Sequence, residues 1–299
     1  MRSNHCISFV LFLLMLIFTS CRQEVDIDYP DFDPKPVINS IIIAGESITA
    51  HISIAAGYDG PQLSGCDDAT VSLYIDDVYA GIMTLQEEGV YISDSIARPD
   101  AKYALSVDIT GYNTASASTY IPPITAISNF QHINIAGLND EGSTYAAIEF
   151  SFQNDQDRIN YYDARIFLDG HDYRSDMNPV YISDSILLNE GLPLTLFSDE
   201  IIQDVQEYHM HINYTSGSHS SSNETGWIMN LYPLVLEFRS TSEEYYNYKR
   251  QLYLYETGRF PEFGISSNAA YPLYSNVENG YGIVAGYSYF ATDTIRPEY

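Results

Sequence analysis

The stretch SITAHISI, residues 47–54, alternates between polar and apolar side chains without a break. Successive side chains of a β-strand point to opposite faces of the sheet, so this stretch predicts a strand with one face in a core. The same alternation returns in residues 71–75 and 103–109. Turn-forming residues separate these stretches, at Asp59-Gly60-Pro61, Asp76-Asp77, Glu88-Gly89, Arg98-Pro99-Asp100 and Thr110-Gly111.

About seven short strands with turns between them predict a β-sandwich of immunoglobulin-like or transthyretin-like type over residues 37–123. Pro122-Pro123 closes this half, because neither residue can donate a hydrogen bond to a sheet. The expected fold class is therefore mainly β, with a second β-rich domain over residues 124–299. Expected strands of that second domain cover residues 146–152, 161–168, 180–187, 208–214 and 227–238.

One amphipathic helix is expected near residues 241–257. Thr241 and Glu244 have the spacing of a capping box, and Gly258 and Pro261 follow the helix. Apolar positions within it recur every three or four residues, at Tyr245, Tyr248, Leu252 and Tyr255. Packing of this tyrosine stripe against a sheet is the expected role, and a stacking surface for a sugar or peptide is the alternative.

The N-terminus reads MRSNHCISFVLFLLMLIFTSC and has the features of a signal peptide over residues 1–20. Its apolar run is too short to span a bilayer as a helix. Phe18-Thr19-Ser20-Cys21 resembles a bacterial lipobox, in which Cys21 receives lipid before cleavage. An ordinary cleaved signal with a coincidental cysteine is the alternative.

Residues 21–36 carry five acids and three prolines, which predicts an extended acidic tether. Acids directly after the lipidated cysteine are also similar to the signal that sends Bacteroidetes lipoproteins to the cell exterior. We therefore expect a lipid-anchored protein of the outer membrane that faces the cell surface, with a periplasmic orientation as the alternative.

Acidic residues outnumber basic ones by 40 to 13, and the formal net charge is -27. Such a polyanion repels phosphate backbones, which excludes nucleic acid as a partner. Of the 3 cysteines, Cys6 leaves with the signal and Cys21 carries lipid, so Cys66 has no partner for a disulfide. Asp67 and Asp68 should raise the pKa of Cys66 and make it a poor nucleophile.

The sequence contains no nucleophile elbow, P-loop, zinc-protease motif or dinucleotide fingerprint. We therefore expect no enzyme and no cofactor beyond the lipid. His209 and His211 would share one face of a strand and could hold a transition metal, and a solvated strand face is the alternative. Asn154, Asp155, Asp157 and Asn160 could hold calcium, although turn-forming residues also explain that loop.

The hexapeptide YISDSI occurs at residues 91–96 and again at residues 181–186, which suggests two related modules. Its Asp-Ser-Ile triplets, together with Asp293-Thr294-Ile295, resemble the O-glycosylation sequon of Bacteroidetes surface proteins. The resemblance implies sugar on Ser95, Ser185 and Thr294.

The segment YSNVENGYGIVAGYS, residues 274–288, carries the strongest family signal. It accompanies the segment from Ser242 to Tyr248, the strand at residues 160–163 and the lipobox. In this order they resemble the Bacteroidetes lipoproteins of domain-of-unknown-function family 4249, from about Glu24 to Phe290. The family implies an accessory to TonB-dependent outer-membrane receptors, and it brings no catalytic residues.

The expected function is therefore a binding module that assists such a receptor in nutrient uptake. Two other classes stay open at this point. One is a carboxylate-dependent hydrolase, either a glycosidase or a peptidase, because 40 acids always offer pairs of carboxylates. The other is a structural or adhesive surface protein.

Overall fold

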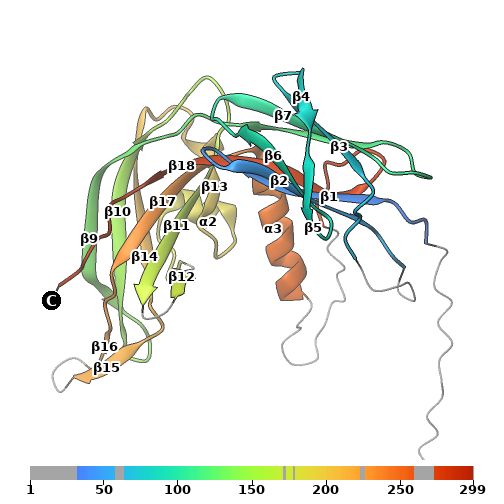
Figure 1. Ribbon diagram of the computed structural model, residues 1–299. Helices are drawn as coiled ribbons and strands as arrows, with labels where there is room; N and C mark the ends of the chain where they lie inside the picture. The colour runs from blue at the N-terminus through green and yellow to red at the C-terminus, as the bar shows by residue number, and fades with distance from the viewer. Residues whose placement is uncertain are drawn as a thin grey trace, which may run out of the picture.

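The computed structural model describes residues 32–57, 64–170, 173–177, 179–222, 226–258 and 273–298 (Figure 1). Strands dominate and one long helix accompanies them, which confirms the predicted mainly β fold class. Within these residues, no helix is long and apolar enough to cross a membrane. Cys21 and the rest of the N-terminal segment up to residue 31 lie outside the described part.

One nine-stranded sheet runs through the molecule and contains strands from both halves of the chain. Its order is β12-β11-β17-β18-β1-β2-β6-β5, and the short β13 pairs with β11. In that order the strands cover Tyr173–Met177, Tyr161–Gly170, Leu234–Thr241, Tyr281–Ala291, Pro36–Ile43, Ser47–Ile54, Val90–Ile96 and Thr84–Glu87, and β13 covers Leu196–Ser198.

A four-stranded sheet completes a sandwich in the N-terminal half. Its core lies between Ile38, Ile48 and Ile52 of the large sheet and Tyr103 and Leu105 of the small one. The alternation of residues 47–54 thus places Ile48, Ala50 and Ile52 inside. In sheet order, the four strands are β4 (Val78–Ile82), β3 (Thr70–Ile75), β7 (Ala101–Asp108) and β8 (Ala115–Ile121).

The C-terminal half packs a three-stranded sheet against the other end of the large sheet. Aromatic rings fill this second core, and Phe152 contacts Tyr162, Phe197 and Phe238 at ring-centroid distances of 5.0 to 6.1 Å. The three strands are β14 (Glu207–Tyr214), β10 (Thr144–Gln153) and β9 (Ile127–Leu138). A hairpin of β15 (His219–Ser222) and β16 (Gly226–Met229), the helix α2 (Ser185–Glu190) and the turn η1 (Glu200–Ile202) complete it.

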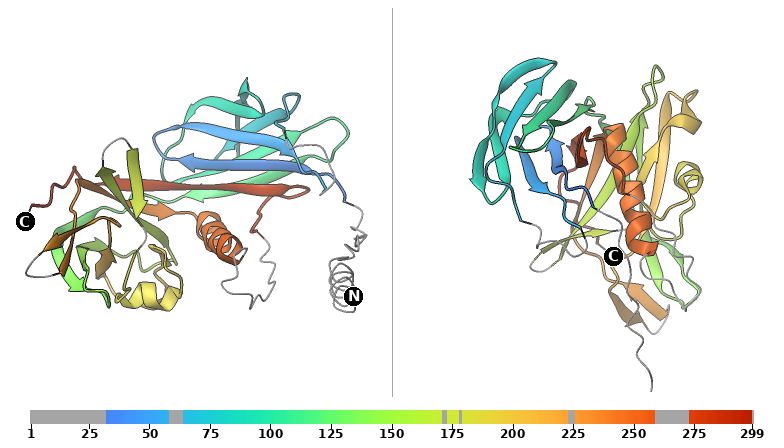
Figure 2. Two further views of the ribbon diagram at one scale, coloured as in Figure 1. Left: turned by 90° about the horizontal axis from the view of Figure 1, so that it is seen from below. Right: turned by 90° about the vertical axis from the view of Figure 1, so that its right-hand side faces the viewer.

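Strand β18 joins the two halves. It pairs in parallel with β1, from Val37↔Tyr281 to Ile43↔Tyr287, and antiparallel with β17, from Thr241↔Tyr287 to Glu237↔Ala291. Figure 2 shows it as the long red strand that runs between the two parts. The domain boundary predicted after residue 123 lies in the link between β8 and β9. The large sheet, however, contains strands from both sides of this boundary.

The long helix α3 (Glu243–Gly258) lies against the large sheet, where Tyr245 packs on Ile283, Ala285 and Tyr287 of β18. Val284 of β18 belongs instead to the N-terminal core, so alternate residues of this strand face opposite sides. The expected packing of Tyr245 on a sheet is confirmed.

The N-cap of α3 differs from the predicted capping box by one residue. Ser242 caps the helix, since its Oγ accepts from the Tyr245 amide at 3.2 Å. The carboxylate of Glu244 does not reach back to the cap but accepts from Thr119 Oγ1 at 2.8 Å. Thr119 lies on β8, so Glu244 ties the helix to the N-terminal sandwich.

The repeated hexapeptide has two different structures, so it does not mark two related modules. Residues 91–96 lie in β6, whereas residues 181–186 form a turn that leads into α2. Asp184 is the N-cap of α2 and accepts from the Ile186 amide at 2.9 Å. The strand predicted for residues 180–187 is therefore wrong, because a capping aspartate and a left-handed Gly191 favour a helix there.

Candidate functional site

Charged side chains lie on the face of the large sheet that α3 covers. In β11, Tyr162, Ala164 and Ile166 enter the C-terminal core, and Asp163 and Arg165 alternate with them on the opposite face. In β17, Glu237 and Arg239 alternate in the same way with Leu236 and Phe238. The strand register places Asp163 opposite Arg239 and Arg165 opposite Glu237, so that unlike charges face each other across the two strands.

Asp163 is 1% exposed and has strong hydrogen-bond donors around it. Thr195 Oγ1 donates to one carboxylate oxygen at 2.9 Å, and Tyr245 Oη donates to the other at 3.2 Å. Arg165 Nη1 lies 3.9 Å from the same carboxylate. Burial, followed by the charge of Asp163, raises the pKa of Tyr245, which keeps its hydroxyl protonated as a donor.

Arg239 is held from several sides. Its Nη2 pairs with Glu237 Oε2 at 2.8 Å, and its Nη1 donates to Tyr245 Oη at 3.2 Å. The guanidinium also lies 4.4 Å from the ring centroid of Tyr287, a cation–π distance. Arg239 is therefore a structural group that fixes Tyr245 and Glu237.

Lys249 lies one helical turn after Tyr245 and is half-buried, with its Nζ 5.9 Å from the Tyr245 ring centroid. Its ammonium has no ion pair or hydrogen bond with any residue in the described ranges. Burial, followed by the charge of Arg165, lowers the pKa of Lys249, and Arg239 acts in the same direction, whereas the carboxylates of Asp163 and Glu256 act in the opposite direction. Among the described residues, this ammonium has the Tyr245 ring nearby but no carboxylate within ion-pair distance.

A pocket of about 190 Å³ opens beside Lys249, and we call it the α3 pocket. It combines the ammonium and the Arg165 guanidinium with an apolar wall from α3, from the start of β13 and from Leu194 just before that strand. Its lining consists of Asp163, Arg165, Leu194, Leu196, Lys249, Leu252, Tyr253 and Glu256. The arrangement suits a small ligand that has both a charged and an apolar part.

A larger groove of about 610 Å³ lies between the four-stranded sheet and the start of α3. Small side chains such as Ser106, Ser116 and Ser118 form its floor, and Lys102 and Glu244 lie at its sides. Lys102 and Glu244 already have partners, Asp77 at 2.8 Å for Lys102 and Thr119 for Glu244, and the third charged residue of the lining, Glu278, is exposed. The α3 pocket is the stronger candidate because its lysine has no hydrogen-bond or ion-pair partner among the described residues.

The predicted metal ligands His209 and His211 do share one face of β14, away from the core. Both imidazoles, however, face Glu149 of β10, at 3.7 Å from His209 Nε2 and 2.8 Å from His211 Nδ1. Their other ring nitrogens contact Ser151 Oγ and Asn213 Oδ1. Among the residues with described positions, no group of three or more His, Cys, Asp or Glu is arranged to hold a metal ion.

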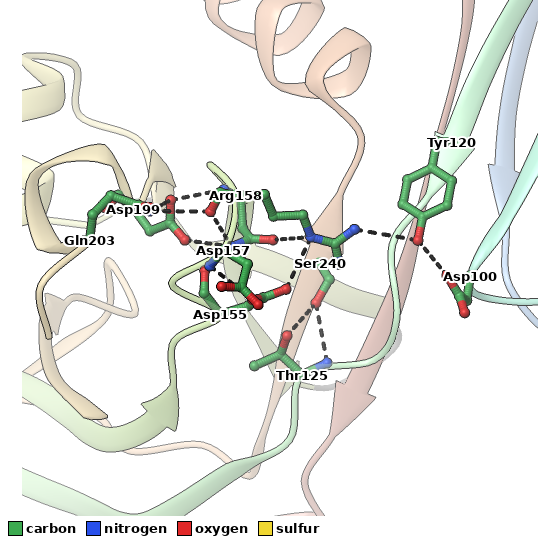
Figure 3. Close-up of polar contacts among 10 residues, drawn as sticks. Asp100, Tyr120, Thr125, Asp155, Asp157, Arg158, Asp199, Gln203 and Ser240 are labelled. Carbon is green, nitrogen blue, oxygen red and sulfur yellow. Dashed lines mark hydrogen bonds and ion pairs between the residues drawn. The ribbon is translucent and has the colours of Figure 1, made fainter. Parts of the chain in front are cut away.

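The predicted calcium loop binds an arginine of its own (Figure 3). Arg158 Nε lies 3.1 Å from Asp155 Oδ2 and 3.0 Å from Asn160 Oδ1, two of the oxygens proposed as ligands. Its Nη1 reaches Tyr120 Oη at 3.4 Å, and that hydroxyl donates to Asp100 at 2.5 Å. The loop is therefore better described as a polar contact between the two halves than as a cation site.

Asp199 anchors this loop from a fully buried position. Its carboxylate accepts from the Asn160 amide at 2.8 Å, from Asn160 Nδ2 at 2.7 Å and from Gln203 Nε2 at 2.8 Å. Burial raises the pKa of Asp199, although the bonds from Asn160 and Gln203 act in the opposite direction.

We expect Asp199→Asn to lower the free energy of unfolding by about 2 kcal/mol, because its amide would set a donor against the donors of Asn160 and Gln203. Urea unfolding at neutral pH measures the change. Asp157→Asn, at an exposed position of the same loop, is the matched control and should change stability by less than about 0.5 kcal/mol. Equal effects of the two substitutions would contradict an anchoring role for Asp199.

The other predicted sites are distributed over the surface. Ser95 is half-buried in β6, Ser185 is exposed at the start of α2 with its Oγ 3.0 Å from Tyr208 Oη, and Thr294 is exposed after β18. Glycosylation of all three stays a prediction. Cys66 is buried, and burial followed by the hydrogen bond to Asp68 raises its pKa to about 11, in the predicted direction.

Lys249, Arg165 and Arg239 were not among the predicted site residues. A signal was present, because Asp163-Ala-Arg165 and Glu237-Phe-Arg239 each insert charges at alternate positions of an apolar strand. Both strands show the same pattern, which points to a polar surface on one face of a sheet. The sequence does not predict that α3 covers this surface, because that contact depends on the tertiary structure.

Comparison with known proteins places the chain in a family without assigning a reaction to it. No curated protein matches it. The model of the family described as Domain of unknown function (DUF4249) matches residues 22–293, which is most of the 299-residue chain. The protein belongs to this DUF4249 family, the one that its sequence resembles.

Proposed function

We propose that this protein is a lipoprotein of the outer membrane, held by lipid on Cys21, that serves as a binding module for a TonB-dependent receptor in nutrient uptake. The observation that carries the binding role is the α3 pocket, where a half-buried ammonium lies near the Tyr245 ring but has no hydrogen-bond or ion-pair partner among the described residues. The pocket offers charge and apolar surface to a ligand. Its carboxylate Asp163 is already bound to Thr195 and Tyr245, so it is poorly placed to act as a catalytic acid or base.

A lipid anchor on Cys21 and a short tether would keep the folded part of the protein close to a receptor in the membrane. Residues 21–36 can span at most about 55 Å between the lipid and β1, which keeps the body close to the bilayer. The body carries a large excess of acids and is repelled by anionic lipid, so it would be held near the surface by the acyl chains alone.

Affinity capture tests the partnership. The protein with a C-terminal tag is purified from detergent-solubilised outer membranes of its own host, and co-purified proteins are identified by mass spectrometry. We expect a TonB-dependent receptor in stoichiometric amounts. Another outer-membrane lipoprotein with the same tag is the control. Repeated recovery of the protein alone, or of the same receptor with the control, would contradict the proposal.

A further inference from the structure

We propose that the α3 pocket binds a monocarboxylate with a short apolar group, with the carboxylate against Lys249 and Arg165 and the carbon chain against the leucines. This inference names the ligand class of the binding module and rests on the proposed function.

The charge pattern of the chain makes Lys249 unusual. Acids outnumber bases by 40 to 13, so a base can readily find a carboxylate. Lys102 pairs with Asp77, Arg239 with Glu237 and Arg250 with Glu190. Lys249 pairs with none of the described acids and lies near two guanidinium groups. Burying a cation in this way is unfavourable unless an anion compensates it, so the free protein is arranged for an anionic ligand.

The two carboxylates that line the pocket, Asp163 and Glu256, do not form an ion pair with the Lys249 ammonium. Asp163 accepts from Thr195 and Tyr245, and its nearest base is Arg165. Glu256 is exposed at the rim, two turns along α3, and forms no ion pair with Lys249. Both acids, however, repel a second negative charge. A singly charged carboxylate is therefore favoured over a doubly charged phosphate.

The remaining lining selects the other end of the ligand. Leu194, Leu196, Leu252 and Tyr253 form an apolar wall beside the two bases. The volume of about 190 Å³ has room for roughly six non-hydrogen atoms, if each takes about the 30 Å³ that a water molecule occupies in the liquid. Butyrate has this size and combines one carboxylate with a three-carbon chain.

The lysines provide a direct readout, since Lys35, Lys102 and Lys249 are the lysines of the chain. Reductive methylation with ¹³C-formaldehyde labels each ammonium group and keeps its charge. NMR of the detergent-solubilised protein then follows each signal during titration with butyrate, and the Lys249→Gln variant assigns the Lys249 signal. We expect this signal to shift saturably, with a Kd of millimolar order or tighter, while the signals of Lys35 and Lys102 stay in place.

Four further titrations separate the alternatives. The neutral analogue 1-butanol and inorganic phosphate should each bind at least tenfold more weakly than butyrate. Glu256→Gln should tighten butyrate binding three- to tenfold, because it removes a repelling carboxylate at the rim. The control Glu243→Gln, at an exposed position in the first turn of the same helix, should leave the Kd unchanged.

The inference is overturned if butyrate shifts no lysine signal, if it shifts all of them alike, or if phosphate or 1-butanol binds as well as butyrate. None of these results depends on a receptor. If the receptor is captured but the Lys249 signal does not shift with butyrate, the ligand class is refuted and the proposed function still stands.

Discussion

Replacement of Cys21 by alanine should abolish incorporation of radiolabelled palmitate and remove the protein from the outer-membrane fraction. In a lipobox the cysteine thiol is acylated before the signal segment is cut, so the variant should also retain residues 1–20. Its mass would exceed that of the lipid-free mature polypeptide by the mass of this segment. The effect should be all or none, because stable anchoring needs at least two acyl chains at about 0.8 kcal/mol per buried methylene.

The other cysteines supply the controls for this experiment. Cys6→Ala changes the proposed signal segment and Cys66→Ala changes the buried thiol, and both variants should incorporate palmitate as the unaltered protein does. If Cys21→Ala is still cut after residue 20 and remains in the membrane, Cys21 is a coincidental residue behind an ordinary signal. The lipoprotein proposal would then fail.

Substitution of Gly282 should cause the largest loss of stability in the folded body. Gly282 lies in β18 opposite Ile38 of β1, with φ +105, a backbone conformation that favours glycine. A Cβ at this position would overlap the carbonyl oxygen of Ile38. Since that atom is backbone, β18 would have to move away from β1, which would disturb the strand that joins both halves.

We expect Gly282→Ala to lower the free energy of unfolding by at least about 3 kcal/mol, from about 1–2 kcal/mol of backbone strain plus a similar or larger cost of overpacking. Gly111→Ala is a close match, because Gly111 has φ +92 and nothing within 4 Å of the added Cβ. It should cost only about 1 kcal/mol. Chemical denaturation of both variants measures the difference. Equal losses would show that β1 and β18 are not closely paired at this point.

Local patterns predicted much of the fold correctly. Residues 47–54 place Ile48 and Ile52 in the core, and the tyrosine at position 245 packs on a sheet as expected. These features depend on the side-chain periodicity of strands and helices, which can be read from residues that are close together in the sequence. The hexapeptide at residues 91–96 and 181–186 shows where this reasoning ends. Identical residues form a strand in one place and a helix start in the other, because different partners surround them.

The pairing of β18 with β1 was not among the expected features, and neither was the α3 pocket. Residues 37–43 and 281–287 are far apart in the chain, and no feature of either segment predicts that the two pair as strands. The cations of the pocket come from β11 and α3, which meet only after the large sheet has formed. Lys249 could be placed on a helix face from its spacing to Tyr245, but that no described carboxylate pairs with it depends on all its neighbours in the fold.

The amino-acid sequence by itself determined the mainly β class, the long helix and the family, because strand alternation, helix spacing and motif order are local properties of the chain. Only the tertiary structure decided that one sheet unites both halves through β18 and that α3 covers its charged face. The physical reason is that hydrogen bonds between distant strands and the burial of an ammonium group depend on three-dimensional proximity, which chain closure and core packing establish together.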